Sequence, residues 1–593
     1  MVDSKLRGAE VSAEATMQRS LIRPVLVGIV IGSFMGFVDS YGYAVTGYTV
    51  AEIELVVAPI IAGILLGRRS DPRNIFIASV TAFGIALSTV ITSGMVITYF
   101  LTSKIYWIFY REKDFPSWLY SSDHTCLPNI FSCEWPYTYL ALAALSLIGV
   151  GFAYLLRHIF LDKLNLPYPL GIASALMSQI MSFVRSMRAV IIAIITGFSL
   201  QLILMIYTPG SIDLTPSFAE HGYGILLALS FDLIILLISL LLPPRASASI
   251  GSGSLIAGFL LLPLGASMHL YPLPPHASMD TLVNSASWYM ASIVFGSVFP
   301  LMAIVARNVG VPLMHLARTL GESRRMTLLL LSLLMGLASI LIIAYMRSGY
   351  PGPFFLVFGA VLVLIIVPLL VIITSWGAGE AGTVSQAFYP ASTIYMYMSG
   401  FRGFAPYVYM DHYLGIPMPS TLSASSLHIL RASRILGITP SLILAIFSLS
   451  YLVGSIITIY YGYLLITLYG NDPSKMPLDR WIPYAIWSLS VYRGELNPVT
   501  IIPGAAIGAA TIASLLLLGS IAGRGFSPIP LIIGLTLTPD LGILFIMGSF
   551  LRWFISRFGA EAEKQLIIIS GSSLGGGGIA IVIYTIASMA GIF

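Results

Sequence analysis

The chain has 593 residues, of which 57% are hydrophobic and 9% are charged, and its formal net charge at pH 7 is +5. A soluble domain carries about 25% charged residues, so the composition excludes a water-soluble globular protein. The basic residues gather at the ends of apolar runs, as in membrane proteins, so nothing supports a nucleic-acid partner. These runs are continuous over about 20 residues, enough to cross a bilayer core of roughly 30 Å. They predict an all-α polytopic membrane protein rather than a β-barrel, in which short alternating strands are expected.

Fourteen apolar runs are predicted to span the membrane, and two further segments, 164–184 and 377–401, are predicted to be broken or re-entrant helices. Together they make about 14–16 membrane segments. We divide the chain into an N-terminal segment (1–23), a first half (24–325) and a second half (326–593), and expect pseudo-symmetric halves because each contains a discontinuous helix. The predicted spans are 24–45, 50–67, 75–101, 137–156, 189–208, 223–243, 249–268, 286–306, 326–346, 353–375, 438–469, 498–522, 528–549 and 567–592.

The basic loops set the expected orientation. Lys and Arg residues follow the second, fourth and eighth spans, and all of them fall inside if the N-terminus is cytoplasmic. We therefore expect a multi-pass protein of the cell membrane with a cytoplasmic N-terminus. One loop does not fit this orientation. The loop 550–566 carries Arg552, Arg557 and Lys564, but the count of spans places it outside the cytoplasm. A miscounted half-helix near the C-terminus is the simplest explanation.

The two cysteines, Cys126 and Cys133, lie seven residues apart in one polar loop. The expected orientation places this loop outside the cytoplasm, where a disulfide persists; two free thiols are the alternative. A zinc site is disfavoured, because only His124 lies nearby and tetrahedral zinc takes four ligands. We predict no metal and no cofactor.

The first hairpin holds the densest group of charges in an apolar region. Asp39, Glu52 and Glu54 lie near Tyr41, among further tyrosines and glycines. Polar groups and glycine at membrane depth are typical of an unwound segment that lines a cavity, where they bind solute or ions. The alternative is a short extracytoplasmic turn with solvated acids.

The segment Asn165–Ala175 contains Pro167, Tyr168, Pro169 and Gly171. Proline cannot continue a helix but begins one well. The pattern predicts a helix N-terminus whose free N–H groups face a site that favours an anionic group such as a carboxylate. A plain interhelical loop is the alternative.

The segment Trp376–Gln386 places Gly377, Gly379 and Gly382 around Glu380. We interpret the glycines as breaks in a second discontinuous helix, facing the same central cavity as the first. In such a place Glu380 is the best candidate for binding the driving proton or contacting the solute. A solvated loop acid is the alternative.

Asp232 lies in the middle of the predicted span 223–243. A charged residue inside a span is costly and is therefore a candidate for function. We consider proton or counter-ion binding, and an interhelical hydrogen bond as the alternative.

Three stretches of the chain resemble the oligopeptide transporter (OPT) family, which includes metal-chelate carriers of the yellow-stripe type. Leu156–Ala175 is similar to the family stretch in which a basic residue precedes Leu-Pro-aromatic-Pro-x-Gly-x-Ala by about ten residues. Arg23–Tyr48 resembles its opening glycine-rich helix, and Asp411–Pro419 its later Gly-His-Tyr element. Leu170 departs from the Ser or Glu common in relatives, and the last helix lacks a Glu common there. The resemblance implies secondary active transport, usually proton-coupled symport of short peptides or metal chelates.

Two rival classes have less support in the sequence. For a membrane-embedded protease or lipid-linked glycosyltransferase, the chain lacks the motif His-Glu-x-x-His, and the loop acids Glu112, Asp114 and Asp123 are scattered. A passive channel would need a filter-like segment, and the sequence contains none. No Gly-x₄-Gly-Lys-Ser/Thr loop is present, which excludes ATP drive within this chain. We predict a transporter, not an enzyme, whose partners are a small solute, protons and lipid.

Overall fold

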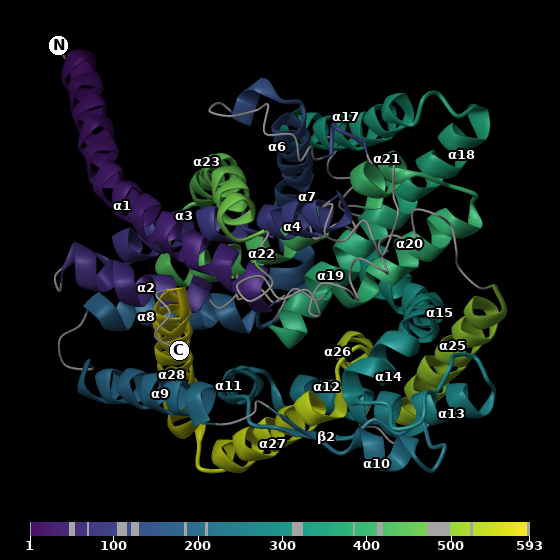
Figure 1. The fold of residues 1–593 in the computed structure, drawn as a ribbon. Helices are drawn as coiled ribbons and strands as arrows, with labels where there is room; N and C mark the ends of the chain where they lie inside the picture. Colours follow the sequence, from purple (N-terminus) through teal and green to yellow (C-terminus); the bar gives the residue numbers. More distant parts are fainter. Residues whose placement is uncertain are drawn as a thin grey trace.

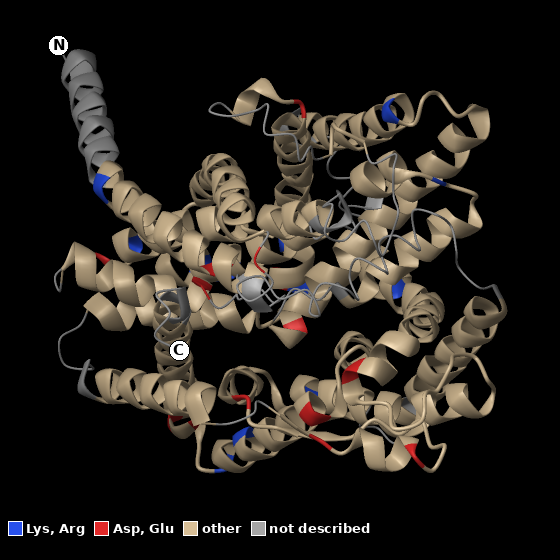
Figure 2. Cartoon of the chain, in the orientation of Figure 1, with Lys and Arg blue, Asp and Glu red and all other residues tan. Residues whose placement is uncertain are grey.

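The computed structural model describes residues 2–46, 54–67, 70–102, 116–119, 130–182, 187–207, 211–310, 324–382, 386–411, 419–470, 472, 498–521 and 526–589. These residues are almost wholly helical, and the helices pack into one bundle from which the start of α1 projects (Figure 1). Charged residues are few along the ribbon (Figure 2). The two short strands β1 and β2 pair antiparallel, with Ile212 opposite Leu229.

The elements are bounded as follows in chain order: α1 (Val2–Thr46), α2 (Glu54–Leu66), α3 (Pro72–Leu87), α4 (Val90–Thr102), η2 (Ile130–Ser132), α6 (Trp135–Ser146), α7 (Ile148–Arg157), η3 (His158–Lys163), α8 (Pro169–Ser182), α9 (Met187–Tyr207), β1 (Ser211–Asp213), α10 (Thr215–Ala219), β2 (Ala228–Ser230), α11 (Leu233–Leu241), α12 (Pro244–Ile256), η5 (Ala257–Leu261), α13 (Leu262–Ser267), α14 (Met279–Ser285), α15 (Ser287–Val305), η6 (Ala306–Gly310), α17 (Arg324–Arg347), α18 (Pro353–Val361), η7 (Leu362–Ile366), α19 (Val367–Ala381), η8 (Gln386–Phe388), α20 (Tyr389–Met398), α21 (Phe404–Pro406), η9 (Tyr407–Asp411), α22 (Pro419–Leu436), α23 (Pro440–Tyr469), α25 (Pro498–Ile521), α26 (Pro528–Leu535), α27 (Pro539–Ser556) and α28 (Ala560–Met589).

Within the described residues, twelve helices are long and apolar enough to cross a membrane, and several of them join consecutive elements. This confirms the predicted class, an all-α polytopic membrane protein. The twelve are Leu21–Gly42, Pro72–Tyr99, Trp135–Lys163, Ala189–Tyr207, Pro244–Ser267, Ser287–Gly310, Thr327–Arg347, Pro353–Ala381, Pro440–Tyr469, Val499–Gly519, Pro539–Ser556 and Ala560–Tyr584.

Proline begins many of these helices and glycine brings them together. Proline is the first residue of α3, α8, α12, α18, α22, α23, α25, α26 and α27. At this position its missing N–H costs no hydrogen bond. Where α9 packs on α28, a Cβ on Gly197 would lie 2.2 Å from the Ser573 carbonyl oxygen, and one on Gly576 would lie 2.0 Å from that of Ile194. Small residues of this kind allow the close backbone approach on which helix association in lipid depends.

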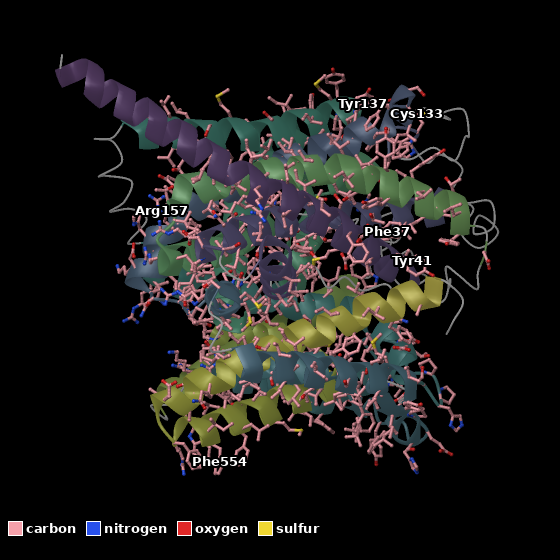
Figure 3. All side chains as sticks on the ribbon, turned by 90° about the vertical axis from the view of Figure 1, so that its left-hand side faces the viewer. Phe37, Tyr41, Cys133, Tyr137, Arg157 and Phe554 are labelled. Carbon is pink, nitrogen blue, oxygen red and sulfur yellow. The ribbon has the colours of Figure 1, made fainter. Side chains whose placement is uncertain are left out.

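The bundle has two distinguishable ends. Figure 3 shows Arg157 and Phe554 at one end of the helices and Cys133 and Tyr137 at the opposite end. We call these the Arg157 end and the Cys133 end. Phe554 lies within the predicted basic loop 550–566, so this part of the chain lies at the same end as Arg157. The sequence-based count, which separated them, is wrong.

The predicted span 528–549 contributes to the miscount, because it is two helices. The chain breaks at Thr538 because Pro539 cannot continue α26. Ser254 of α12 donates its Oγ hydrogen to the Thr538 carbonyl at 2.8 Å, and Ser549 donates to the carbonyl of Pro244 at 2.7 Å. The N–H of Ser527, just before α26, donates to Ser249 Oγ of α12 at 2.9 Å, so α26 leads toward Ser254 and α27 returns along α12. We call these two helices the α26–α27 hairpin.

Two other predicted spans are shorter than expected. Segment 223–243 contains β2 and the nine-residue α11, which covers only about 14 Å. Segment 50–67 contains α2, with 13 residues. Asp232, expected in mid-span, is the N-cap of α11 and accepts the N–H of Ile235 at 3.0 Å. Its carboxylate begins a helix, so the prediction of a mid-span charge is wrong.

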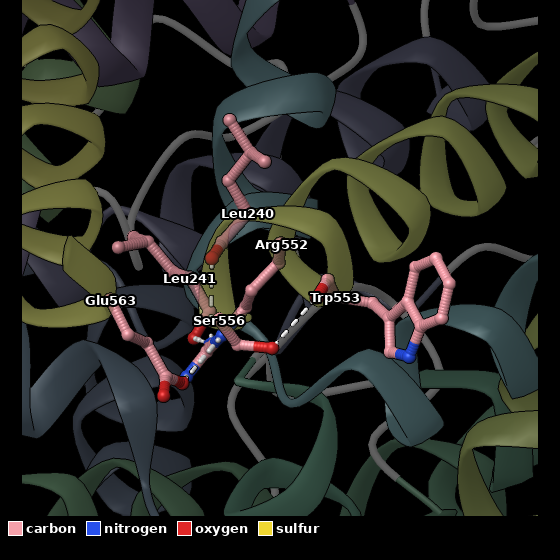
Figure 4. Close-up of polar contacts among 6 residues, drawn as sticks. All are labelled: Leu240, Leu241, Arg552, Trp553, Ser556 and Glu563. Carbon is pink, nitrogen blue, oxygen red and sulfur yellow. Dashed lines mark hydrogen bonds and ion pairs between the residues drawn. The ribbon is translucent and has the colours of Figure 1, made fainter. Parts of the chain in front are cut away.

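Arg552 connects three helices, α27, α11 and α28, by hydrogen bonds. It lies on α27 with only 8% of its surface exposed and donates from Nη1 to the carbonyl of Leu241 at 2.6 Å (Figure 4). A longer bond of 3.4 Å reaches the Leu240 carbonyl. Nη2 donates to Glu563 Oε1 on α28 at 2.7 Å. The guanidinium therefore caps the C-terminus of α11 and joins the hairpin to α28.

Candidate functional site

The two broken segments predicted from the sequence meet each other. Asn165 and Tyr168 have positive φ of 45° and 48°, which turn the chain sharply before α8. The N–H of Tyr168 donates to the carbonyl of Gly379 at 3.0 Å, and its hydroxyl donates to the carbonyl of Ser375 at 2.9 Å. The Gly379 carbonyl lies among the last four of α19, which lack partners within their helix. The turn that contains Pro167 and Tyr168 thus completes the end of α19.

The glycines of α19 act differently from their prediction. Gly377 and Gly379 lie inside the continuous helix, so their assignment as breaks is wrong, and α19 ends at Gly382, whose φ is 75°. A Cβ on Gly379 would lie 2.8 Å from Leu166 Cδ1, and one on Gly377 2.9 Å from Ile529 Cγ2. They are needed for close approach by neighbouring segments rather than for an unusual backbone.

The start of α8 is partnered by a histidine. His428, on α22, is buried, and its Nδ1 accepts the N–H of Gly171 at 3.2 Å. The His428 ring meets the ring of Tyr168 edge to face, with centroids 5.2 Å apart. One of the free N–H groups that follow Pro169 is therefore occupied by an imidazole rather than left for an anion. His428 Nε2 is also buried.

Glu380 is held at the end of α19 by two donors. Trp376 Nε1 donates to Oε1 at 2.9 Å, and Ser527 Oγ donates to Oε2 at 2.6 Å. Arg245 of α12 also interacts electrostatically with this carboxylate. Glu380 lies in regular helix, contrary to expectation, and its carboxylate connects α19 to the residue that precedes α26.

The acids of the first hairpin form a second buried group. Asp39 is 4% exposed and accepts the Thr89 hydroxyl at 2.5 Å. Glu54, the first residue of α2, is 3% exposed and interacts electrostatically with Asp39, and its Oε2 has no hydrogen-bond partner among the residues that the structure describes. Tyr41 is buried against Tyr469, with ring centroids 5.8 Å apart.

Two predicted residues cannot be placed. Glu52 and Cys126 lie outside the described residues, so the pairing of Cys126 with Cys133 stays a prediction. Cys133 follows η2, and its N–H donates to the Ile130 carbonyl at 3.3 Å.

A cavity of about 250 Å³ lies at the tip of the α26–α27 hairpin. Apart from Ser287, Thr536 and Thr538 its lining is apolar, and none of the lining residues is charged. It touches the second broken segment at Pro390 but no residue of the first, so the expectation that both broken segments face one cavity is wrong for this cavity. The lining is formed by Leu226, Ala257, Gly258, Leu262, Val283, Ser287, Met290, Ala291, Val294, Pro390 and Leu535–Pro539.

The sequence reasoning missed α22, which it placed in a polar stretch between spans. Eighteen residues long, α22 is buried along nearly its whole length and packs on α7, α8 and α19. Its serines and His428 lower its hydropathy below that of a span. The available signal was a proline start followed by many small residues and no acid, which is typical of an inner helix in a membrane bundle.

Comparison with known proteins adds one finding. Residues 122–588 match the family model described as OPT oligopeptide transporter protein. The matched region includes both broken segments, α22 and the α26–α27 hairpin. The pair of Asp39 and Glu54 precedes it. A search of curated proteins finds no match.

Proposed function

The chain belongs to the oligopeptide transporter family, and from this premise we propose that it is a secondary active transporter that couples the uptake of a short peptide or a metal chelate to a proton gradient. Transport, rather than a catalysed reaction, is the activity we propose. In this proposal the Arg157 end faces the cytoplasm together with the N-terminus, because the basic loops gather there.

The observation that carries the coupling proposal is the buried pair of Asp39 and Glu54. An ionised carboxylate inside a protein is costly unless it is paired and hydrogen-bonded, and no described residue donates a hydrogen bond to Glu54 Oε2. Two neighbouring carboxylates disfavour simultaneous ionisation, so the pair is suited to hold one exchangeable proton.

Glu380 is the second acid in the proposal. Both of its oxygens accept hydrogen bonds, from Trp376 and Ser527, and these bonds favour the ionised form. Protonating Glu380 would weaken its hold on Ser527 and thus loosen the start of α26. We assign it to the movement of the hairpin rather than to the first uptake of the proton.

The cavity at the hairpin tip supports a small solute. Its volume of about 250 Å³ lies just below the range of roughly 300–1,000 Å³ that is usual for small-molecule sites. The non-helical backbone between α26 and α27 forms part of the cavity lining. In other transporters, broken helices of this kind form the solute site. We place the apolar part of the solute there.

Uptake into liposomes tests the proposal. The purified chain is reconstituted and offered labelled di- and tripeptides and metal chelates, with and without an inward proton gradient. One pH unit supplies about 1.4 kcal/mol per proton, or about tenfold accumulation. Glu54→Gln should abolish accumulation while solute exchange at equal pH continues. Glu220→Gln, at an exposed acid, is the control and should accumulate solute as the parent does.

Two results would overturn the proposal. Accumulation that ignores the proton gradient would exclude proton coupling. If the Glu54→Gln protein concentrates solute like the parent and Glu380→Gln is inactive, the coupling proton must be assigned to Glu380 instead.

A further inference from the structure

Three arginines lie together at the Arg157 end of the bundle. Arg431 and Arg434 are three residues apart on α22, so their side chains are neighbours on the helix surface. Arg157 is the last residue of α7. Electrostatic interactions place Arg434 beside each of the other two. We call Arg157, Arg431 and Arg434 the arginine cluster.

One acid, Asp162, interacts with the arginine cluster in the part of the chain that the structure describes. Its Oδ1 lies 2.6 Å from Arg434 Nη1, and its charge also attracts Arg157. Its other oxygen, Oδ2, lies 2.9 Å from His158 Nδ1. Both carboxylate oxygens therefore have partners already, and three guanidinium groups share a single negative charge.

Arg431 is the member of the cluster whose charge has no counter-ion. Its side chain is only partly exposed, and no described residue accepts a hydrogen bond from it or forms an ion pair with it. The charged group beside it is Arg434, which repels it. A partly buried charge in such surroundings is unfavourable unless an anion pairs with it. The cluster therefore has the charge and the free donors to bind an anion.

The arginine cluster lies where membrane-spanning helices end. Arg157 is near the end of the span Trp135–Lys163, and Arg73 is the second residue of the span Pro72–Tyr99. Arg73 Nε donates to the carbonyl of Leu436, the last residue of α22, at 3.1 Å. Figure 3 shows Arg157 at this end of the bundle. Phospholipid headgroups surround spanning helices at their ends, so the cluster lies at the level of lipid phosphates.

An apolar surface leads away from the cluster along α17. A Cβ on Gly151 of α7 would lie 2.7 Å from Leu333 Cδ2 of α17. About one turn earlier on α7, Ile148 lies against Gly336. The two helices therefore run antiparallel, and the start of α17 lies toward the end of α7. Leu328, in the second turn of α17, is 57% exposed and offers a surface on which acyl chains can pack.

We propose that the arginine cluster binds the phosphate group of an anionic phospholipid, whose acyl chains lie along the exposed side of α17. A guanidinium matches a phosphate through two parallel N–H donors, and basic pockets between membrane helices bind anionic headgroups. The phosphate supplies the anion that Arg431 lacks and offsets its repulsion by Arg434. This binding does not depend on whether the chain transports a solute.

Thermal unfolding of the full chain in a neutral detergent tests the site, with phosphatidylglycerol or phosphatidylcholine added in equal amounts. Phosphatidylglycerol should raise the unfolding temperature of the parent. For Arg431→Gln the half-saturating phosphatidylglycerol concentration should be about tenfold higher, as expected for the loss of one hydrogen bond between charged groups. In phosphatidylcholine, Arg431→Gln should be at least as stable as the parent, because the substitution removes an unpaired charge.

Arg557→Gln is the matched control. Arg557 is exposed three residues after Phe554, at the same end of the bundle, and its Cζ lies 3.8 Å from the centroid of the Trp553 ring. The substitution removes the same charge outside the cluster, so this variant should respond to phosphatidylglycerol as the parent does.

Four results would overturn the site. One is an equal response to phosphatidylglycerol in the parent and Arg431→Gln, and another is an equal loss of response in Arg431→Gln and Arg557→Gln, which would indicate general attraction to a charged surface. A loss of stability of Arg431→Gln in phosphatidylcholine would assign Arg431 to the fold. Stabilisation of the parent by the same concentration of glycerol phosphate would indicate a site for free anions. Gradient-driven uptake is measured separately, so its failure contradicts the proposed function and leaves the lipid site standing.

Discussion

Replacing Gly171 with alanine tests how closely α8 must approach α22. A Cβ at this position would lie 2.2 Å from the His428 carbonyl oxygen, whereas ordinary contact begins at 3.4 Å. This oxygen belongs to the backbone and cannot rotate away, so the two helices must separate by the difference, 3.4 − 2.2 = 1.2 Å. The same movement stretches the 3.2 Å bond from the Gly171 N–H to His428 Nδ1.

The expected cost follows from three effects. Overpacking costs about 1–3 kcal/mol, and a weakened buried hydrogen bond adds about 1 kcal/mol. Alanine in place of glycine regains about 0.5–1 kcal/mol of helix propensity. We therefore expect Gly171→Ala to lower the free energy of unfolding by about 1–3 kcal/mol. Titration with SDS in mixed micelles measures it.

Gly571 offers the control for this substitution, since it faces α8 from α28. A Cβ there would meet Met177 Cε at 3.5 Å and Ala173 Cβ at 3.8 Å, which are ordinary contacts. Gly571→Ala should leave stability unchanged or raise it by up to about 1 kcal/mol. If Gly171→Ala is as stable as Gly571→Ala, the close contact of α8 and α22 is not a constraint of the fold and the reasoning fails.

Two further predictions concern the bonds that join broken helices. Arg552→Met should destabilise the protein by about 3 kcal/mol, because it leaves Glu563 and the end of α11 without their partner. Arg347→Met, which removes an exposed ion pair with Glu134, should cost at most about 1 kcal/mol; equal losses in SDS titrations would contradict the distinction. Tyr168→Phe should cost about 1 kcal/mol, the loss of one buried hydroxyl bond to α19, and an unchanged unfolding curve would show that this bond contributes nothing.

The class of the protein and the place of its first break follow from local chemistry. Hydropathy and length predict spanning helices because lipid leaves the backbone no other partners. Pro167 and Pro169 predict an interruption because proline removes a donor and restricts the preceding residue. Both rules act within a few residues, and both describe α8 and the turn before it correctly.

The predictions that were wrong depended on contacts between a residue and neighbouring helices rather than on the sequence around it. Glu380 was expected in irregular backbone, but the glycines around it accommodate neighbours such as Leu166, and no local rule distinguishes the two uses of glycine. Asp232 looks like a mid-span charge until its N-cap bond to Ile235 is known. The role of α22 was hidden because serine lowers hydropathy whether it faces water or another helix.

The broken helices explain why a break can be located in sequence while its partner cannot. Each interruption frees backbone groups that lipid cannot satisfy, and each is completed by a distant element. Tyr168 donates to the end of α19, His428 accepts from the start of α8, and Ser254 donates to the hairpin tip. Arg552 donates to the end of α11. These donors and acceptors are ordinary residues of other helices, chosen by the packing and not by any local pattern. Because each one holds a break closed, any movement that opens the bundle must release or replace it.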